Sequence, residues 1–188
     1  TEHAVFLGSE KYDGENEFKS HLSKHGGSSN GGTGMDITTF QFEVRTSAFE
    51  KTLDIWSNFF VKPLFRDDAI GREVMAVTAE DSKNRILDGR RMLQVLKDVM
   101  DPREKWTKYS TGNVHSLSLG KAEENAKDLA QIMKRFHQLN YQPNKMSLAI
   151  CGPMGIEELK RLAVEYFEGI SAPEIDPGIV SEAEEKGL

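Results

Sequence analysis

The segment of residues 67–100 constrains the fold more than any other part of the sequence. From Asp67 to about Met100 only Gly89 interrupts a helical pattern, and the acidic start favours a helix N-terminus. One face of this helix collects residues at helical spacing: Ala69, Glu73, Val77, Glu80 and Asn84. We therefore expect a long helix with two glutamates on a partly apolar face, where a buried carboxylate needs a partner or a metal ion. The alternative is that both glutamates are solvated residues of a helix that is charged all round.

Length and composition limit the classes of protein that this chain can be. Its 188 residues suffice for one domain with a sizeable core, or for one domain and a tail. The net charge of −6 argues against a nucleic-acid or anionic-membrane surface as the main function. No apolar run approaches the roughly 20 residues that span a membrane. The single cysteine, Cys151, excludes an intramolecular disulfide, favours a cytoplasmic or organellar location, and is expected to be a small buried hydrophobe.

The other segments alternate between helical and extended patterns. Residues 37–44 place Phe40, Phe42 and Val44 on one side, as a strand with one buried face does. Residues 26–34 are rich in Gly and Ser and predict a loop or an irregular edge strand. Further elements are expected as helices at 15–24, 47–62, 122–139 and 155–169, and as a strand at 146–151. Prolines and an acidic run indicate that residues 171–188 form an exposed tail or interdomain linker.

The first three residues, Thr1-Glu2-His3, match the end of an H-x-x-E-H motif. In that motif two histidines, four apart on one helical face, bind zinc, and the glutamate acts on a metal-bound water. The first histidine would lie two residues before Thr1, outside the sequence. Glu-His is a common dipeptide, so these residues indicate a metal site only in combination with others.

Taken together, these features resemble the catalytic N-terminal domain of the inverted-zincin peptidases of family M16, and the insulysin branch most closely. The resemblance covers residues 1 to about 170 in order. Its matching stretches are Glu2-His3 and residues 6–12, 22–30, 59–65, 72–80, 83–84, 109–113 and 146–152. The resemblance implies an α+β fold, with an antiparallel or mixed sheet and long helices packed mainly on one face. Residues 1–170 would be a partial, N-terminally truncated M16 catalytic domain, followed by the tail at 171–188.

The resemblance also implies a zinc site and its residues. Glu2 would be the catalytic general base, and His3 and Glu80 would be two ligands of Zn²⁺. Glu73 would be the carboxylate that orients a ligand imidazole.

A substrate site follows from the same resemblance. Residues Ser29, Asn30, Gly31 and Gly32 match the edge strand to which such enzymes add an extended peptide. Phe6 and Arg91 match further substrate-binding positions. The family usually has Ala where Gly31 stands, and insulysin-like members have an aromatic residue at Gly32 and Trp at Arg90. We therefore expect a substrate preference that differs from theirs.

The implied function is that of a zinc metalloendopeptidase domain that hydrolyses peptide bonds of oligopeptides or small proteins. Its partners would be the peptide and the remaining M16 domains of the parent chain. Because the first motif histidine and those domains are not in the sequence, we expect the isolated chain to be inactive. The alternatives are a non-catalytic M16 homologue that binds peptides or proteins, and a scaffold module.

Overall fold

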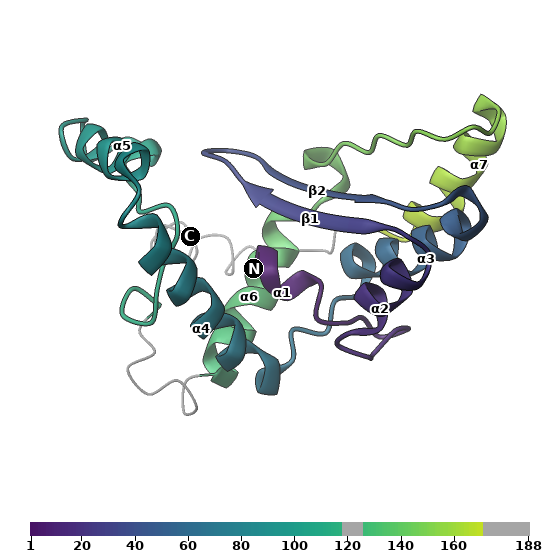
Figure 1. The fold of residues 1–188 in the computed structure, drawn as a ribbon, viewed down its shortest axis with the longest axis horizontal. Coiled ribbons are helices and arrows are strands. Elements are labelled where there is room, and N and C mark those ends of the chain that lie inside the picture. Colours follow the sequence, from purple (N-terminus) through teal and green to yellow (C-terminus); the bar gives the residue numbers. More distant parts are fainter. Residues whose placement is uncertain (118–125, 171–188) are drawn as a thin grey trace.

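The computed structural model describes residues 1–117 and 126–170, and in this part of the chain the helices lie mainly on one face of a two-stranded antiparallel hairpin (Figure 1). The strands are β1 (Ser28–Thr33) and β2 (Thr38–Glu43). The helices are α1 (Glu2–Val5), α2 (Glu17–Lys24), α3 (Phe49–Val61), α4 (Asp67–Asn84), α5 (Asp88–Asp98), α6 (Ala126–Asn140) and α7 (Ile156–Phe167). The α+β prediction is confirmed. The predicted tail at 171–188 lies outside the described residues.

The glycine-rich segment forms a regular strand, where the sequence predicted a loop or an irregular edge. All six residues of β1 pair with β2, from Ser28 opposite Glu43 to Thr33 opposite Thr38. The reason is the pattern of β2, whose Phe40 and Phe42 pack against the buried core and fix the register for its neighbour. The strand is therefore imposed by its partner rather than by its own composition.

Two glycines allow α2 to turn directly into β1. Gly26 has φ of +64°, and the Gly27 N–H donates to the carbonyl of Leu22 at 2.8 Å, which closes a Schellman-type helix end. A Cβ atom on Gly27 would lie only 2.5 Å from the carbonyl oxygen of Glu43. The close approach of the two strands at this point therefore requires glycine.

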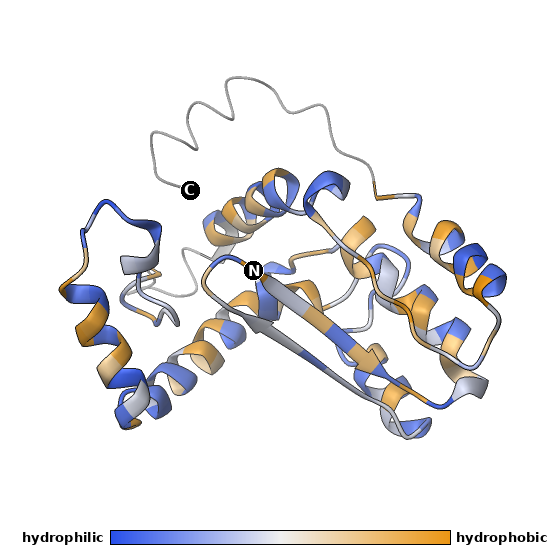
Figure 2. Cartoon of the chain, turned by 90° about the horizontal axis from the view of Figure 1, so that it is seen from above, coloured by the Kyte–Doolittle hydropathy of each residue, from blue (hydrophilic) through white to orange (hydrophobic). Residues whose placement is uncertain are grey.

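An aromatic cluster joins the first part of the chain to the hairpin. The Phe6 ring centroid lies 6.2 Å from Phe18, 5.4 Å from Phe40 and 5.5 Å from Phe59, which belong to α2, β2 and α3. In Figure 2 apolar stretches, in orange, alternate with hydrophilic ones, in blue, along the helices, and α1, α2, α3, α4, α6 and α7 each contribute buried residues to the core. Phe6 is stacked on Phe18 and meets Phe40 and Phe59 edge to face, and such ring contacts add to the free energy that area burial supplies.

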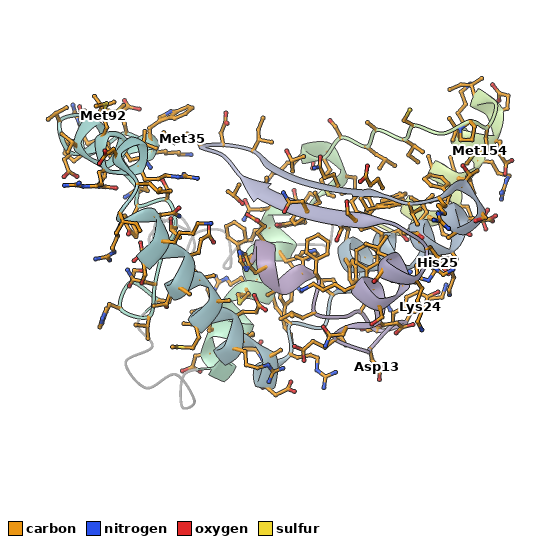
Figure 3. All side chains as sticks on the ribbon, in the orientation of Figure 1. Asp13, Lys24, His25, Met35, Met92 and Met154 are labelled. Carbon is orange, nitrogen blue, oxygen red and sulfur yellow. The ribbon has the colours of Figure 1, made fainter. Side chains whose placement is uncertain are left out.

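The long helix predicted for residues 67–100 is two helices. The break falls at 85–87, where Leu87 is extended with φ −90° and ψ 120°, and Gly89 lies within the first turn of α5. Tertiary contacts with residues 108–113 hold both sides of the break. Asn113 donates to the carboxylate of Asp81 in α4 at 3.0 Å, and the buried Lys97 of α5 donates to the Lys108 carbonyl at 2.8 Å. The outer face of α5 stays exposed, and Met92 marks it in Figure 3.

The strand predicted at 146–151 is wrong for the described part of the chain. Residues 146–151 carry no strand assignment, and in Figure 1 they run as a coil above the hairpin. Cys151 is exposed rather than buried, and the side chain of Leu148 is 41% exposed. An alternating pattern forms a strand only where a neighbour supplies hydrogen bonds, and the described residues place none beside this segment. No helix in the described ranges is long and apolar enough to cross a membrane.

His137 of α6 gives the stability of this fold a pH dependence. Its side chain is 8% exposed, its ring stacks on Tyr141, and burial lowers its pKa to about 4 from 6.5. The unfolded chain therefore binds a proton that the folded chain excludes as pH falls from 6.5 towards 4. We expect His137 to reduce the free energy of unfolding by about 3 kcal/mol across that window, measured by denaturant unfolding.

The control is His137→Phe, which keeps a ring between Tyr141 and Phe65 and removes the titrating group. The free energy of unfolding is measured against pH for the wild-type protein and for this variant. The difference between the two curves is the contribution of His137, because both proteins have the same carboxylates. Equal pH dependence in the wild type and His137→Phe would contradict the assignment.

Candidate metal and peptide site

The short helix α1 is held at its C-terminal end, and this fixes the residues at its start. Ala4 and Val5 are buried, at 1% and 0% exposure. Gly8, with φ of +126°, turns the chain, and its carbonyl accepts from the Leu64 N–H at 3.1 Å. Because one side of α1 is buried and its end is tied to the segment after α3, Glu2 and His3 face β1 and α4.

His3 lies between two glutamates of α4. Its Nδ1 is 3.1 Å from Oε2 of Glu73, and its Nε2 is 3.6 Å from Oε2 of Glu80. The two glutamates are seven residues, two helical turns, apart and so share a face, as the sequence predicts. Hydrogen bonding of Nδ1 to a carboxylate fixes the ring and leaves Nε2 directed at the second carboxylate. A carboxylate that bonds the other ring nitrogen of a metal-binding histidine orients the ring in this way.

The donors in this arrangement are of the type that zinc binds. Imidazole nitrogen and carboxylate oxygen, from His3 and Glu80, are common zinc ligands, and a catalytic zinc takes three protein ligands. Within residues 1–117 and 126–170 no group of three His, Cys, Asp or Glu side chains is placed to hold a metal ion. The described residues therefore fit two of the three ligands.

Glu2 lies beside His3 and against β1. A hollow of about 290 Å³ is lined by residues of α1, α2, β1 and α4, among them Glu2, His3, Phe6, Ser29, Asn30, Gly31 and Glu73. The structure thus brings together most of the residues that the sequence singled out. Phe6 both lines this hollow and belongs to the aromatic cluster.

One edge of β1 is open in the part of the chain that the structure describes. The sheet order is β1-β2, so β1 has a strand partner on one side only. The hollow that holds Glu2 and His3 contains Ser29, Asn30 and Gly31 of this strand. An open edge beside polar groups offers backbone N–H and C=O groups to an extended peptide of almost any sequence.

Two predicted substrate residues do not line this hollow. Arg91 is on α5, pairs with Asp88 at 3.4 Å, and lines a separate cavity of about 400 Å³ with Arg85 and Arg90. Gly32 lies in β1 between Gly31 and Thr33, and a Cβ atom there would meet nothing within 4 Å. The structure does not bring Arg91 to Glu2, and the roles of both residues stay predictions.

Sequence reasoning missed two residues next to Glu2. The hydroxyl of Thr33 donates to Oε2 of Glu2. Burial, and then the charge of Glu2, raise the pKa of Tyr141 to about 12. The period of two along β1 could have indicated Thr33, since it shares a face with Gly31. No comparable signal places Tyr141, which lies just beyond α6.

Comparison with known proteins identifies the family. The family model "Insulinase (Peptidase family M16)" matches residues 1–103, and the model "Peptidase M16 inactive domain" matches residues 128–187. The chain therefore belongs to the insulinase family of peptidases, family M16.

Curated relatives and solved structures agree with this assignment. The chain is 36% identical over 169 residues to insulin-degrading enzyme of Homo sapiens, covering 90% of this chain and 16% of that protein. It is 36% identical over 170 residues to the A-factor-processing enzyme of Saccharomyces cerevisiae, with the same coverage of 90% and 16%. The crystal structure of pitrilysin superposes with a TM-score of 0.80 at 31% identity, covering 93% of this chain and 19% of that one. A protease from Helicobacter pylori shares the fold, with a TM-score of 0.76 at 18% identity over 93% of this chain and 40% of that one. The chain thus spans about a sixth of the length of the curated relatives quoted.

Gly32, which has free space for a side chain, and Gly27, which has none, give a prediction for stability. Gly32→Ala should raise the free energy of unfolding by about 0.5–1 kcal/mol, because the strand loses a flexible residue and the new Cβ meets no atom. Gly27→Ala should lower it, because its Cβ would lie 2.5 Å from a backbone oxygen. Thermal or denaturant unfolding of both variants measures the difference. Equal effects of the two substitutions would contradict the described path of β1.

Proposed function

We propose that this chain contributes the zinc- and peptide-binding part of a metalloendopeptidase that hydrolyses peptide bonds of oligopeptides or small proteins. The observation that carries the proposal is the position of His3, with Nδ1 at Glu73, Nε2 at Glu80, and Glu2 as its neighbour in α1. Membership of the M16 family supports it.

Each residue of this group has a distinct role in the proposal. His3 and Glu80 would hold a zinc ion, which supplies Lewis acidity when bound. Glu73 fixes the orientation of the His3 ring through Nδ1. Glu2 is the general base, which takes a proton from the attacking water and then delivers it to the leaving amine.

The substrate in this proposal is an extended peptide that adds to the open edge of β1 along Ser29, Asn30, Gly31 and Gly32. Backbone hydrogen bonds would supply most of the affinity and would tolerate many sequences. Ser29, Asn30 and Gly31 of this strand line the same hollow as Glu2, so an added peptide would present a backbone carbonyl to the water that Glu2 deprotonates. Two glycines leave this wall of the site without side chains, which favours bulky substrate residues there. Phe6 and Arg91 are further substrate contacts in the proposal.

The remaining domains of the family are the proposed intramolecular partners. The relatives quoted above are far longer than this chain, which covers 16% of each. In the proposal those domains close over the peptide and exclude water from Glu2 and His3.

A non-catalytic homologue that binds peptides or proteins is the second candidate. In this candidate a peptide binds the open edge of β1 without being cleaved. The residue two positions before Thr1 in the complete protein decides between the candidates. A histidine there supports the peptidase, and a residue that cannot bind zinc supports the binding protein.

The ligand count predicts weak zinc binding by this chain alone. Isothermal titration calorimetry should show no tight, stoichiometric site, because two protein ligands leave the coordination incomplete. Glu10→Gln, at an exposed residue paired with Lys62, serves as a control for nonspecific binding. Tight binding with one zinc per chain that is lost in Glu80→Gln would contradict this expectation.

The role of Glu2 predicts a separation of metal binding from turnover. In the complete protein, Glu2→Gln should retain one zinc per active site and lose at least about 10²-fold in kcat, as expected when a general base is removed. Zinc content by mass spectrometry and cleavage of a quenched fluorescent peptide measure the two properties. Near-normal turnover of the variant would refute Glu2 as the base.

A further inference from the structure

The side chain of Glu2 lies flat on the strand that the substrate is proposed to join. A Cβ atom on Gly31 would lie 3.2 Å from Oε1 of Glu2 and 3.4 Å from its Cγ. Two residues along the same strand, the Thr33 hydroxyl donates to Oε2. Because residues two apart in a strand face the same side, the carboxylate lies over the bare face of Gly31 while Thr33 bonds one of its oxygens.

A second hydroxyl extends this contact to β2. Thr33 and Thr38 are directly opposed in the hairpin, and their Oγ1 atoms are 3.2 Å apart. A threonine hydroxyl has one hydrogen to donate. Because Thr33 uses its hydrogen for Glu2, Thr38 is the donor between the two hydroxyls. The carboxylate therefore ends a chain of two hydrogen bonds, and such chains polarise their members.

We propose that Thr33 is a positioning residue that orients the carboxylate of Glu2 for its work as the base. This inference rests on the proposed peptidase function. Glu2 lies in a four-residue helix and is partly exposed, so the backbone of α1 alone leaves its three side-chain torsions free to rotate. The Thr33 hydroxyl restrains one oxygen, and the bare backbone of Gly31 leaves space for the other.

The arrangement also links the base to substrate binding. The oxygen of Glu2 is tied to the last residue of β1, and the strand itself is the proposed platform at Ser29–Gly32. A peptide added to this edge would rigidify the strand and with it the hydroxyl that holds Glu2. Thr33 therefore acts on the turnover step rather than on peptide affinity.

The test uses the complete protein loaded with zinc and a quenched fluorescent peptide. Thr33→Val keeps the shape of the side chain and removes the hydroxyl, so kcat should fall about 10- to 100-fold while KM changes less than about twofold. Thr33→Ser keeps the hydroxyl and should restore kcat to within about threefold of wild type. Thermal unfolding and zinc content of each variant show that the fold and the metal are retained.

The matched control is Ser28→Ala. It removes a side-chain hydrogen bond to Glu43, 3.0 Å long, at the opposite end of the same hairpin. This variant should keep wild-type kcat. Wild-type kcat in Thr33→Val, or an equal loss in Ser28→Ala, would overturn the proposal.

The variant Glu2→Gln separates this inference from the proposed function. If Glu2→Gln is inactive and Thr33→Val is fully active, the base assignment stands and only the role of Thr33 fails. If Glu2→Gln turns over normally, Glu2 is not the base, and the positioning role of Thr33 fails with it.

Discussion

The arrangement of this chain depends on the ring of Phe6. It contacts Phe18, Phe40 and Phe59 and so joins α1 to α2, β2 and α3. Glu2 and His3 lie one helical turn before this ring, which places them at a fixed distance from the hairpin. Phe6 is partly buried, so its ring contributes less than the roughly 3 kcal/mol of a fully buried aromatic side chain, but its loss would release the residues that are proposed to carry the chemistry. The packing of Phe6 in the core therefore also determines where Glu2 and His3 lie.

Helix α1 lies between two parts of the structure. One is the apolar cluster beneath the hairpin. The other is the polar face of α4, where Glu73 and Glu80 contact His3 from the far side. The proposed base contacts β1, and the proposed ligand contacts α4, although the two residues are adjacent in sequence. This division gives neighbouring residues different partners, and in the proposed function it would let one short helix serve both metal and peptide.

The sequence predicted the features that depend on local pattern. The spacing of Glu73 and Glu80, the strand at 37–44 and the α+β fold follow from periodicity and family resemblance, and the structure agrees with them. Prediction from the sequence failed where contacts between residues far apart in the chain determine the local structure. The break before α5 is flanked by contacts of Asp81 with Asn113 and of Lys97 with Lys108, and the contact of Thr33 with Glu2 spans 31 residues of sequence. Cys151 is exposed, although it lies in an apolar stretch of the sequence, because burial depends on which distant segments pack against a residue.

The central claim is that His3 and Glu80 direct their donor atoms at one metal position beside Glu2. The most direct test is anomalous scattering at the zinc absorption edge from crystals of the complete protein soaked in zinc. The account predicts a peak about 2.0–2.2 Å from both His3 Nε2 and a carboxylate oxygen of Glu80. Glu73 should remain bonded to Nδ1 of the same ring. A zinc peak that contacts neither His3 nor Glu80 would contradict the account.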